Sequence, residues 1–213
     1  MKEYLVQGYS LNKRLLEKEQ EKFKSLKDAV KLISSISLNK AISSDDKENL
    51  INLLEKYSSA LGLLDDYDFG RIREITHDNQ EVYILSYQEV KAVIDRMKKA
   101  IGGSELFGKE KDDSLKSSIS AIYQTFDGED LYKSLMEKAV NLLYFLVKNH
   151  SFVDGNKRIA ASIFIYFLDK NNFLEKINID NSLLAALTLL IANSKPEERE
   201  LIVNLSSVIL TID

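Results

Sequence analysis

The stretch Leu131–Leu168 decides the fold of this chain, and it reads LYKSLMEKAVNLLYFLVKNHSFVDGNKRIAASIFIYFL. Its two halves are apolar nearly all round, which is typical of helices at the centre of a bundle. The sequence therefore predicts one helix over Leu131–Asn149 and another over Asn156–Lys170. The polar loop His150–Gly155 joins these two core helices.

Composition around this stretch indicates a mainly α protein. The chain has 213 residues with 45% hydrophobic content, enough to bury a substantial core, and it contains only one Pro and eight Gly. Asp45 with Glu48 and Ser86 with Glu89 stand at capping-box spacing. Apolar spacing and such start signals predict further helices over Leu11–Ile36, Lys47–Leu64, Ser86–Ile101, Asn181–Asn193 and Pro196–Leu210.

The first two predicted helices form an N-terminal helical hairpin. Leu16, Phe23 and Val30 recur seven residues apart, as do Leu26 and Ile33, and they give the first helix a narrow apolar seam. We expect this seam to pack on the rest of the chain, with a homodimer through the same seam as the alternative. The polar, turn-rich segment 65–80 then separates an N-terminal extension, 1–66, from the main domain, 67–213.

Two parts of the chain have β character. Ser118–Phe126, SISAIYQTF, contains β-branched and aromatic residues in partial alternation and is predicted to form a short strand that stops at Asp127-Gly128. Ile72–Ile75 and Val82–Leu85 flank a turn-rich sequence and are predicted to pair as a short hairpin.

Charge and residue usage exclude several kinds of protein. The net charge is −4, from 29 basic and 33 acidic side chains that are interspersed, so the basic stripe of a duplex-DNA binder is missing. The absence of Cys excludes disulfides and thiolate metal sites. No apolar run reaches the roughly 18 residues that a membrane helix needs, and no signal peptide opens the chain. We therefore expect a cytoplasmic protein that binds neither nucleic acid nor a membrane.

The loop between the core helices carries more chemistry than a turn requires. His150 follows a helix C-terminus and can accept a proton from a hydroxyl nucleophile. Asp154 offers an oxygen ligand for Mg²⁺, with phosphates supplying others. Gly155 allows a backbone conformation that directs the first N–H groups of the next helix inward, where they bind anions, and Arg158 can grip phosphate oxygens. From these residues alone, a solvent-facing turn with accidental polar side chains stays open.

The nine residues HSFVDGNKR, His150–Arg158, resemble the signature of the Fic/Doc (Fido) family, which is HPFx(D/E)GNGR in Fic proteins and HxFxDANKR in Doc toxins. A weaker resemblance extends over about Leu85–Leu210, and the residues before about Tyr67 look like the N-terminal helical extension of some bacterial Fic proteins. The resemblance implies a Fic-type helical bundle with a short β-hairpin flap. It also implies an enzyme that moves AMP or a phosphoryl group from a nucleotide, ATP with Mg²⁺, to a Ser, Thr or Tyr hydroxyl of a target protein, with an antitoxin as a further partner.

The same resemblance implies a role for each matching residue. His150 corresponds to the general base that deprotonates the target hydroxyl, and Asp154 to the Mg²⁺ ligand. Arg158 corresponds to the residue that neutralises charge developing during transfer. The anion hole for the nucleotide phosphates corresponds to Gly155, Asn156 and Lys157, together with Arg158. The strand that docks a target segment corresponds to Ser118, Ile119, Ser120, Ala121 and Ile122.

Three positions depart from the family patterns. Ser151 replaces the usual Pro, Lys157 replaces the second Gly of the Fic signature as in Doc proteins, and Ala161 stands where AMP-transferring Fic proteins carry a second Arg. A Doc-like site accepts the nucleotide reversed and transfers its γ-phosphoryl group, yet Gly155 is Fic-like where Doc proteins have Ala. The resemblance therefore leaves AMP transfer and phosphoryl transfer both open.

Two alternatives concern regulation and activity. Ser44–Asn49, SDDKEN, matches the inhibitory (S/T)xxxE(G/N) pattern of many Fic proteins, but the same residues fit a helix cap. An inactive Fic-fold module that only binds partners is the alternative to an enzyme. The intact His150, Asp154 and Arg158 favour the enzyme.

Overall fold

The computed structural model describes residues 21, 24–39, 41–63, 82–101 and 104–211, and it is mainly helical with one two-stranded sheet. The N-terminal part contains a helix over 24–37 and α2 (Ser44–Leu63). The remaining α-helices are α4 (Tyr87–Ile101), α5 (Ser114–Ala121), α6 (Leu135–Asn149), α7 (Asn156–Lys170), α8 (Asn181–Asn193) and α9 (Arg199–Thr211). Single 3₁₀ turns lie at Leu174–Lys176 and Pro196–Glu198, and the strands are β1 (Thr125–Phe126) and β2 (Glu129–Asp130).

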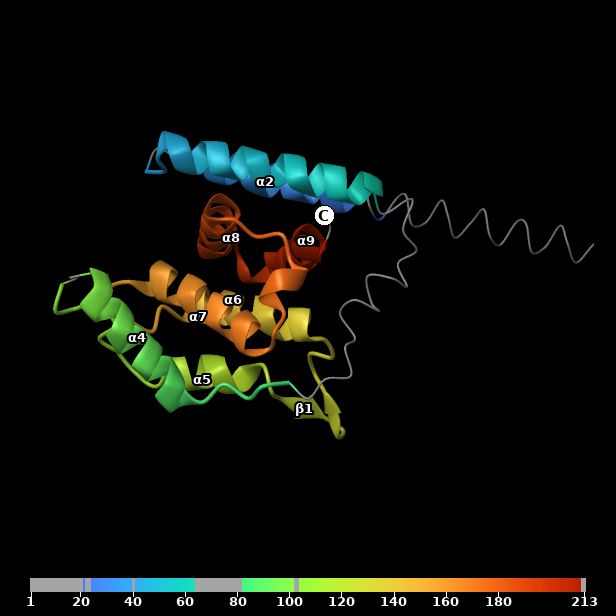
Figure 1. The fold of residues 1–213 in the computed structure, drawn as a ribbon. Coiled ribbons are helices and arrows are strands. Elements are labelled where there is room, and N and C mark those ends of the chain that lie inside the picture. Colours follow the sequence, from blue (N-terminus) through green and yellow to red (C-terminus); the bar gives the residue numbers. More distant parts are fainter. Residues whose placement is uncertain (1–20, 22–23, 40, 64–81, 102–103, 212–213) are drawn as a thin grey trace, which may run out of the picture.

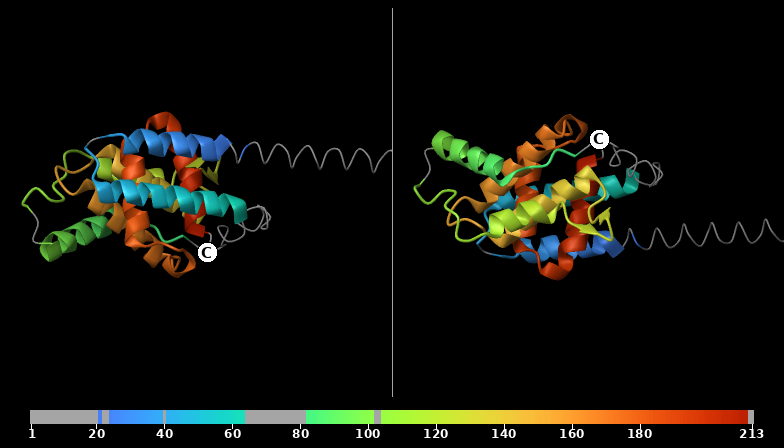
Figure 2. Two further views of the ribbon diagram at one scale, coloured as in Figure 1. Left: turned by 90° about the horizontal axis from the view of Figure 1, so that it is seen from above. Right: turned by 90° about the horizontal axis from the view of Figure 1, so that it is seen from below.

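The helices are stacked in layers, as Figure 1 shows. The helix 24–37 and α2 lie over α8 and α9, the pair α6 and α7 lies beneath these, and α4 and α5 form the opposite side. Figure 2 shows the same stack from above and from below. Because α6 packs against α5, α7, α8 and α9, it is the central helix. The polar loop after α6 therefore starts from the most constrained element of the fold.

A capping box fixes where α6 begins. Ser134 has an extended backbone, and its Oγ accepts a hydrogen bond from Glu137 N at 3.1 Å while the Glu137 carboxylate accepts one from Ser134 N at 3.1 Å. Leu142 and Leu143 are fully buried, as the apolar pattern predicts. The predicted start at Leu131 was four residues too early, because this reciprocal cap makes the helix begin directly after Ser134.

The N-terminal hairpin shares one hydrophobic core with the rest of the protein. Leu50 and Leu53 of α2 are buried where this helix packs on α8 and α9. On the helix 24–37 the buried face consists of Ala29, Leu32, Ile33 and Ile36. The expectation that the hairpin packs on the chain itself is thus confirmed. The predicted seam is correct at Ile33, which is buried, and wrong at Val30, which is 40% exposed. Leu16 and Phe23 lie outside the described residues.

The predicted capping box is wrong for α2 and correct for α4. Ser43 caps α2 by accepting a hydrogen bond from Asp46 N at 3.1 Å, so the predicted pair Asp45 and Glu48 is not the capping box. At α4 the predicted pair is confirmed. Glu89 N donates to Ser86 Oγ at 3.3 Å, and Ser86 N donates to Glu89 Oε2 at 3.0 Å.

The predicted strand Ser118–Phe126 is wrong. Its first half belongs to the helix α5, and only Thr125 and Phe126 pair, in register with Asp130 and Glu129 across a turn at Asp127-Gly128. Serine hydroxyls on α5 bond back to carbonyls one turn earlier, which satisfies them inside a helix despite their weak helix propensity.

Two other predictions fall partly or wholly outside the described residues. Val82–Leu85 forms no strand, and its predicted partner Ile72–Ile75 lies outside the described residues. The predicted boundary between 1–66 and 67–213 also falls there. In the part of the chain that the structure describes, no helix is long and apolar enough to cross a membrane.

Candidate active site

The polar loop between α6 and α7 is bounded by two left-handed residues. His150 ends α6 with φ 50° and ψ 45°, and Gly155 precedes α7 with φ 88°. A Cβ on Gly155 would lie 2.4 Å from the ring of Phe107, so both the backbone and the neighbouring ring require glycine here. Histidine is among the residues that tolerate this conformation, and its side chain is exposed.

The start of α7 offers hydrogen-bond donors and positive charge, which suit an anion. The first intrahelical hydrogen bond runs from Ile159 N to Gly155 O at 2.9 Å. The N–H groups of Asn156, Lys157 and Arg158 precede it and have no carbonyl to reach within the helix, and the helix dipole adds positive charge at this end. Since Lys157 and Arg158 are exposed, their cations are accessible beside these N–H groups. The residues predicted to bind phosphate therefore lie together on the first turn.

Asn156 differs from the expectation in one respect. Its Oδ1 accepts a hydrogen bond from Phe152 N at 2.8 Å, and its Nδ2 donates to Phe152 O at 2.7 Å. Phe152 itself is buried and anchors the loop. The amide side chain of Asn156 thus holds the loop in shape, which leaves only its backbone N–H for an anion.

Asp154 is the one predicted metal ligand, and its surroundings fit a shared Mg²⁺ site. Its carboxylate is 46% exposed, accepts a hydrogen bond from Ser104 Oγ at 3.2 Å and lies 3.9 Å from Arg158 Nη2. The described residues contain no group of three side chains that could hold a metal without help. One accessible carboxylate suits an ion whose other ligands are phosphate and water oxygens.

The segment 107–111 pairs with the loop that carries the candidate site residues. Between α4 and α5, Gly108 N donates to Asp154 O at 3.1 Å and Lys111 N donates to Ser151 O at 2.9 Å, while Lys109 O accepts from Val153 N at 2.9 Å. The same segment supplies Phe107, and the Arg158 guanidinium lies 5.0 Å from the centre of that ring. The loop that carries His150 and Asp154 is therefore held from outside by the segment 107–111.

Comparisons with known proteins agree with this geometry. Residues 84–168 match the model of the Fic/DOC family. Residues 84–168 are therefore similar to a Fic/Doc domain. Over 82 residues it is 40% identical to a protein named Toxin Doc from Mycolicibacterium smegmatis, a match that covers 37% of this chain and 63% of that protein, less than two thirds of its length. No solved structure matches the chain significantly.

The segment predicted as a docking strand is instead part of a helix that contacts and holds the loop. Ser118 is fully buried, and its Oγ accepts a hydrogen bond from Asn149 Nδ2 at 2.8 Å, directly before His150. Ser114 Oγ donates to Ser151 Oγ at 2.8 Å, so the serine that replaces the usual Pro is tied down. A strand over Ser118, Ile119, Ser120, Ala121 and Ile122 is wrong because this stretch is the end of α5, with Ile119 and Ile122 in the core.

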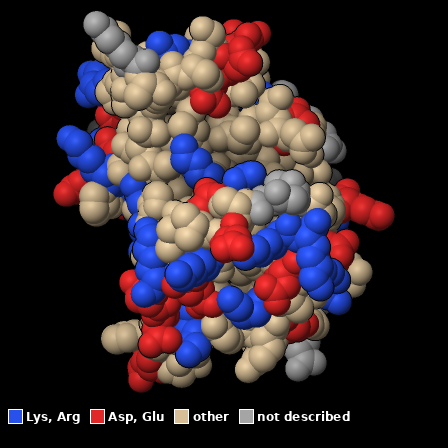
Figure 3. All heavy atoms as spheres, turned by 90° about the vertical axis from the view of Figure 1, so that its left-hand side faces the viewer, with Lys and Arg blue, Asp and Glu red and all other residues tan. Residues whose placement is uncertain are grey.

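The face that contains the segment between α4 and α5 carries both signs of charge. Figure 3 turns the left-hand side of Figure 1 toward the viewer, and Lys and Arg side chains gather across the middle of this face with acidic side chains among them. A duplex-DNA binder presents a more uniform basic surface.

Gly155 provides a stability test of this packing. Gly155→Ala is expected to lower the free energy of unfolding by about 2–5 kcal/mol, from left-handed strain plus overpacking against Phe107. Gly128→Ala is a matched control, because Gly128 has φ 83° but nothing within 4 Å of an added Cβ, and it should cost only about 1–2 kcal/mol. Urea denaturation measures both. In the double variant Gly155→Ala/Phe107→Leu the cost should be less than the sum of the single costs, and equal costs at the two glycines would contradict the packing described.

Proposed function

We propose that this protein transfers the γ-phosphoryl group of ATP to a hydroxyl side chain of a target protein, as a Doc-like phosphotransferase. The observation that carries the proposal is the first turn of α7, where free N–H groups, Lys157 and Arg158 follow a loop with a proton acceptor, His150, at its other end. The match of residues 84–168 to the Fic/DOC family supports a transferase of this type.

The proposed reaction uses the residues as follows. The oxygen of the target hydroxyl attacks the γ-phosphorus, and His150 accepts the proton of that hydroxyl. The bond between the γ-phosphorus and its bridging oxygen breaks, and ADP leaves. The N–H groups of α7 and the Arg158 guanidinium stabilise charge on the phosphoryl oxygens. Asp154 would hold Mg²⁺, which neutralises phosphate charge.

The choice of phosphoryl over AMP transfer rests on two side chains of α7. Lys157 places a four-carbon stem and an ammonium at the anion-binding end, where the Fic signature has glycine. Ala161, one turn later and on the same face, offers a methyl group where AMP-transferring Fic proteins have an Arg. The resemblance to Doc, which shares the Lys, favours the reversed nucleotide. AMP transfer by the same site is the alternative.

The relative's name supports two further parts of the proposal. Because the similar Mycolicibacterium smegmatis protein is named Toxin Doc, we include an antitoxin among the partners of this chain and the cytoplasm as the place where it acts.

Labelled ATP tests the proposal directly. The protein is incubated with Mg²⁺ and bacterial lysate protein as acceptor, once with γ-labelled and once with α-labelled ATP. We expect protein-bound label from γ-labelled ATP only, above the background of a parallel sample with His150→Ala, which corrects for kinases in the lysate. Label from α-labelled ATP would establish AMP transfer instead, and no label above background from either would favour the inactive interaction module.

A further inference from the structure

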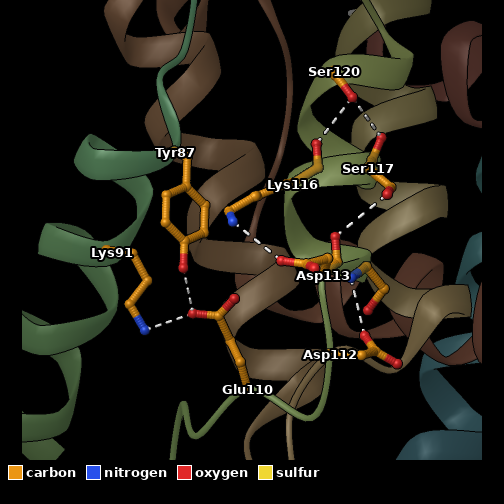
Figure 4. Close-up of polar contacts among 9 residues, drawn as sticks. Tyr87, Lys91, Glu110, Asp112, Asp113, Lys116, Ser117 and Ser120 are labelled. Carbon is orange, nitrogen blue, oxygen red and sulfur yellow. Dashed lines mark hydrogen bonds and ion pairs between the residues drawn. The ribbon is translucent and has the colours of Figure 1, made fainter.

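Glu110 lies between α4 and the active-site loop. Its Oε1 accepts hydrogen bonds from the Tyr87 hydroxyl at 2.9 Å and from Lys91 Nζ at 2.7 Å, both on α4. Figure 4 shows these two side chains converging on the carboxylate, which is only 16% exposed. The side chain of Glu110 thus fixes the segment between α4 and α5 to the surface of α4.

The backbone of Glu110 reaches the active-site loop at the same time. It forms an antiparallel bridge with Phe152, flanked by the hydrogen bonds from Lys111 N to Ser151 O and from Val153 N to Lys109 O. One residue therefore connects α4, through its side chain, with the loop that carries His150 and Asp154, through its backbone.

One face of α4 contacts this segment along its length. Tyr87, Lys91, Ile94 and Lys98 follow one another at spacings of four, three and four residues, which places them on the same face. Lys98 Nζ donates to Glu105 O at 2.8 Å, and Ile94 fills the space beside Gly108, where an added Cβ would lie 2.4 Å from its Cγ2. The face of α4 therefore contacts the segment at Glu105, Gly108 and Glu110.

The protonation of the two partners suits this arrangement. The hydrogen bond to Glu110 is the main cause that raises the pKa of Tyr87, so the phenol keeps its proton at neutral pH and remains a donor. Burial by itself lowers the pKa of Lys91, but the hydrogen bond and charge of Glu110 raise it overall, so the ammonium stays charged. The Glu110 contacts therefore persist at the pH at which transfer would occur.

We propose that Glu110, held by Tyr87 and Lys91, is a positioning residue for the transfer reaction. It fixes the loop His150–Asp154 against the start of α7, so that the proton acceptor and the metal-binding carboxylate lie correctly relative to a bound phosphate. This role rests on the proposed function. Displacement of a reacting group by about 1 Å lowers a rate by up to about 10²-fold, so small movements of this loop matter.

The kinetic test compares variants of the full chain in the lysate assay with γ-labelled ATP. Glu110→Ala is expected to lower the maximal rate about tenfold or more, with the KM for ATP within about twofold, because the phosphate-binding start of α7 is held by its own packing. Glu110→Gln should lie between this variant and wild type, since an amide oxygen still accepts from Tyr87. Lys91→Met should show a smaller loss of the same kind. Lys56→Met is the matched control, because it removes an ion pair with Asp180 at 3.5 Å, between α2 and the N-cap of α8.

Hydrogen exchange gives a second readout that does not depend on transfer. The backbone amides of Lys111 and Val153 should exchange about tenfold faster in Glu110→Ala than in wild type. In Lys56→Met their exchange rates should not change. Unaltered exchange, or a maximal rate within twofold of wild type in a folded Glu110→Ala, overturns the positioning role while the proposed function stands. If Glu110→Ala does not fold, Lys91→Met decides by the same two criteria. Absence of label with the wild-type protein defeats the proposed function, and the exchange result is still obtained.

Discussion

Replacing His150 with alanine is expected to lower the rate of label transfer from ATP about 10²-fold or more while the helical fold persists. The large loss follows from its proposed role, because Ser151, Phe152 and Val153 offer no general base and Asp154 is assigned to the metal. The small effect on folding follows from its exposure at the end of α6. The experiment measures initial rates at saturating ATP, with circular dichroism and the melting temperature on the same samples.

The left-handed backbone of His150 calls for a second variant. Alanine at φ 50° costs about 1–2 kcal/mol of strain, which by itself could disturb the loop. Asparagine tolerates this conformation, so His150→Asn removes the proton acceptor without that strain. We expect both variants to be equally inactive. If His150→Asn transferred label at near the wild-type rate, the general-base role of His150 would be wrong and only loop geometry would matter.

The sequence predicted the long helices well where apolar spacing and end signals agree. The bounds of α7, Asn156–Lys170, and of α8, Asn181–Asn193, are those expected, because Gly155 and Asp180 mark the starts and the apolar residues continue to the ends. α5 was missed because the β-branched and aromatic residues of Ser118–Phe126 indicated a strand, while the serines of the helix are weak helix formers. Their hydroxyls find partners in the helix itself, which intrinsic propensity does not reveal.

The candidate site also contains residues that could be predicted from the sequence and contacts that could not. His150, Asp154, Lys157 and Arg158 could be predicted because they are close in sequence, and one loop brings them together. The contacts that hold this loop could not, since Phe107 and Glu110 lie about forty residues earlier in a charged stretch with no periodicity. Pairing between such distant backbone segments depends on how α4 and α5 pack on α6 and α7. The local pattern of apolar and polar residues does not predict that packing.

The second large effect concerns the reaction type, which depends on Lys157. Wild-type protein is expected to transfer γ-label and no α-label, because the lysine occupies the end of α7 that the α-phosphate would use in a Fic protein and its ammonium is itself a phosphate partner. Lys157→Gly should reopen this end and allow some transfer of α-label. The position is exposed on the first turn, so glycine there should cost about 1 kcal/mol of stability or less.

Adding a second cation should strengthen the switch. Lys157→Gly/Ala161→Arg restores both the space at the start of α7 and a guanidinium one turn later, and Ala161 is only partly buried, so a longer side chain can reach solvent. We expect α-label transfer at least about tenfold above that of Lys157→Gly, since a bidentate arginine contributes about 1.5–3 kcal/mol to a charged phosphate contact. Ala161→Arg alone is the control and should leave γ-transfer dominant, because Lys157 still blocks the other orientation. If wild-type protein attaches α-label, or if the double variant attaches only γ-label, the lysine does not select the nucleotide orientation, and AMP transfer or a different determinant of orientation replaces the proposal.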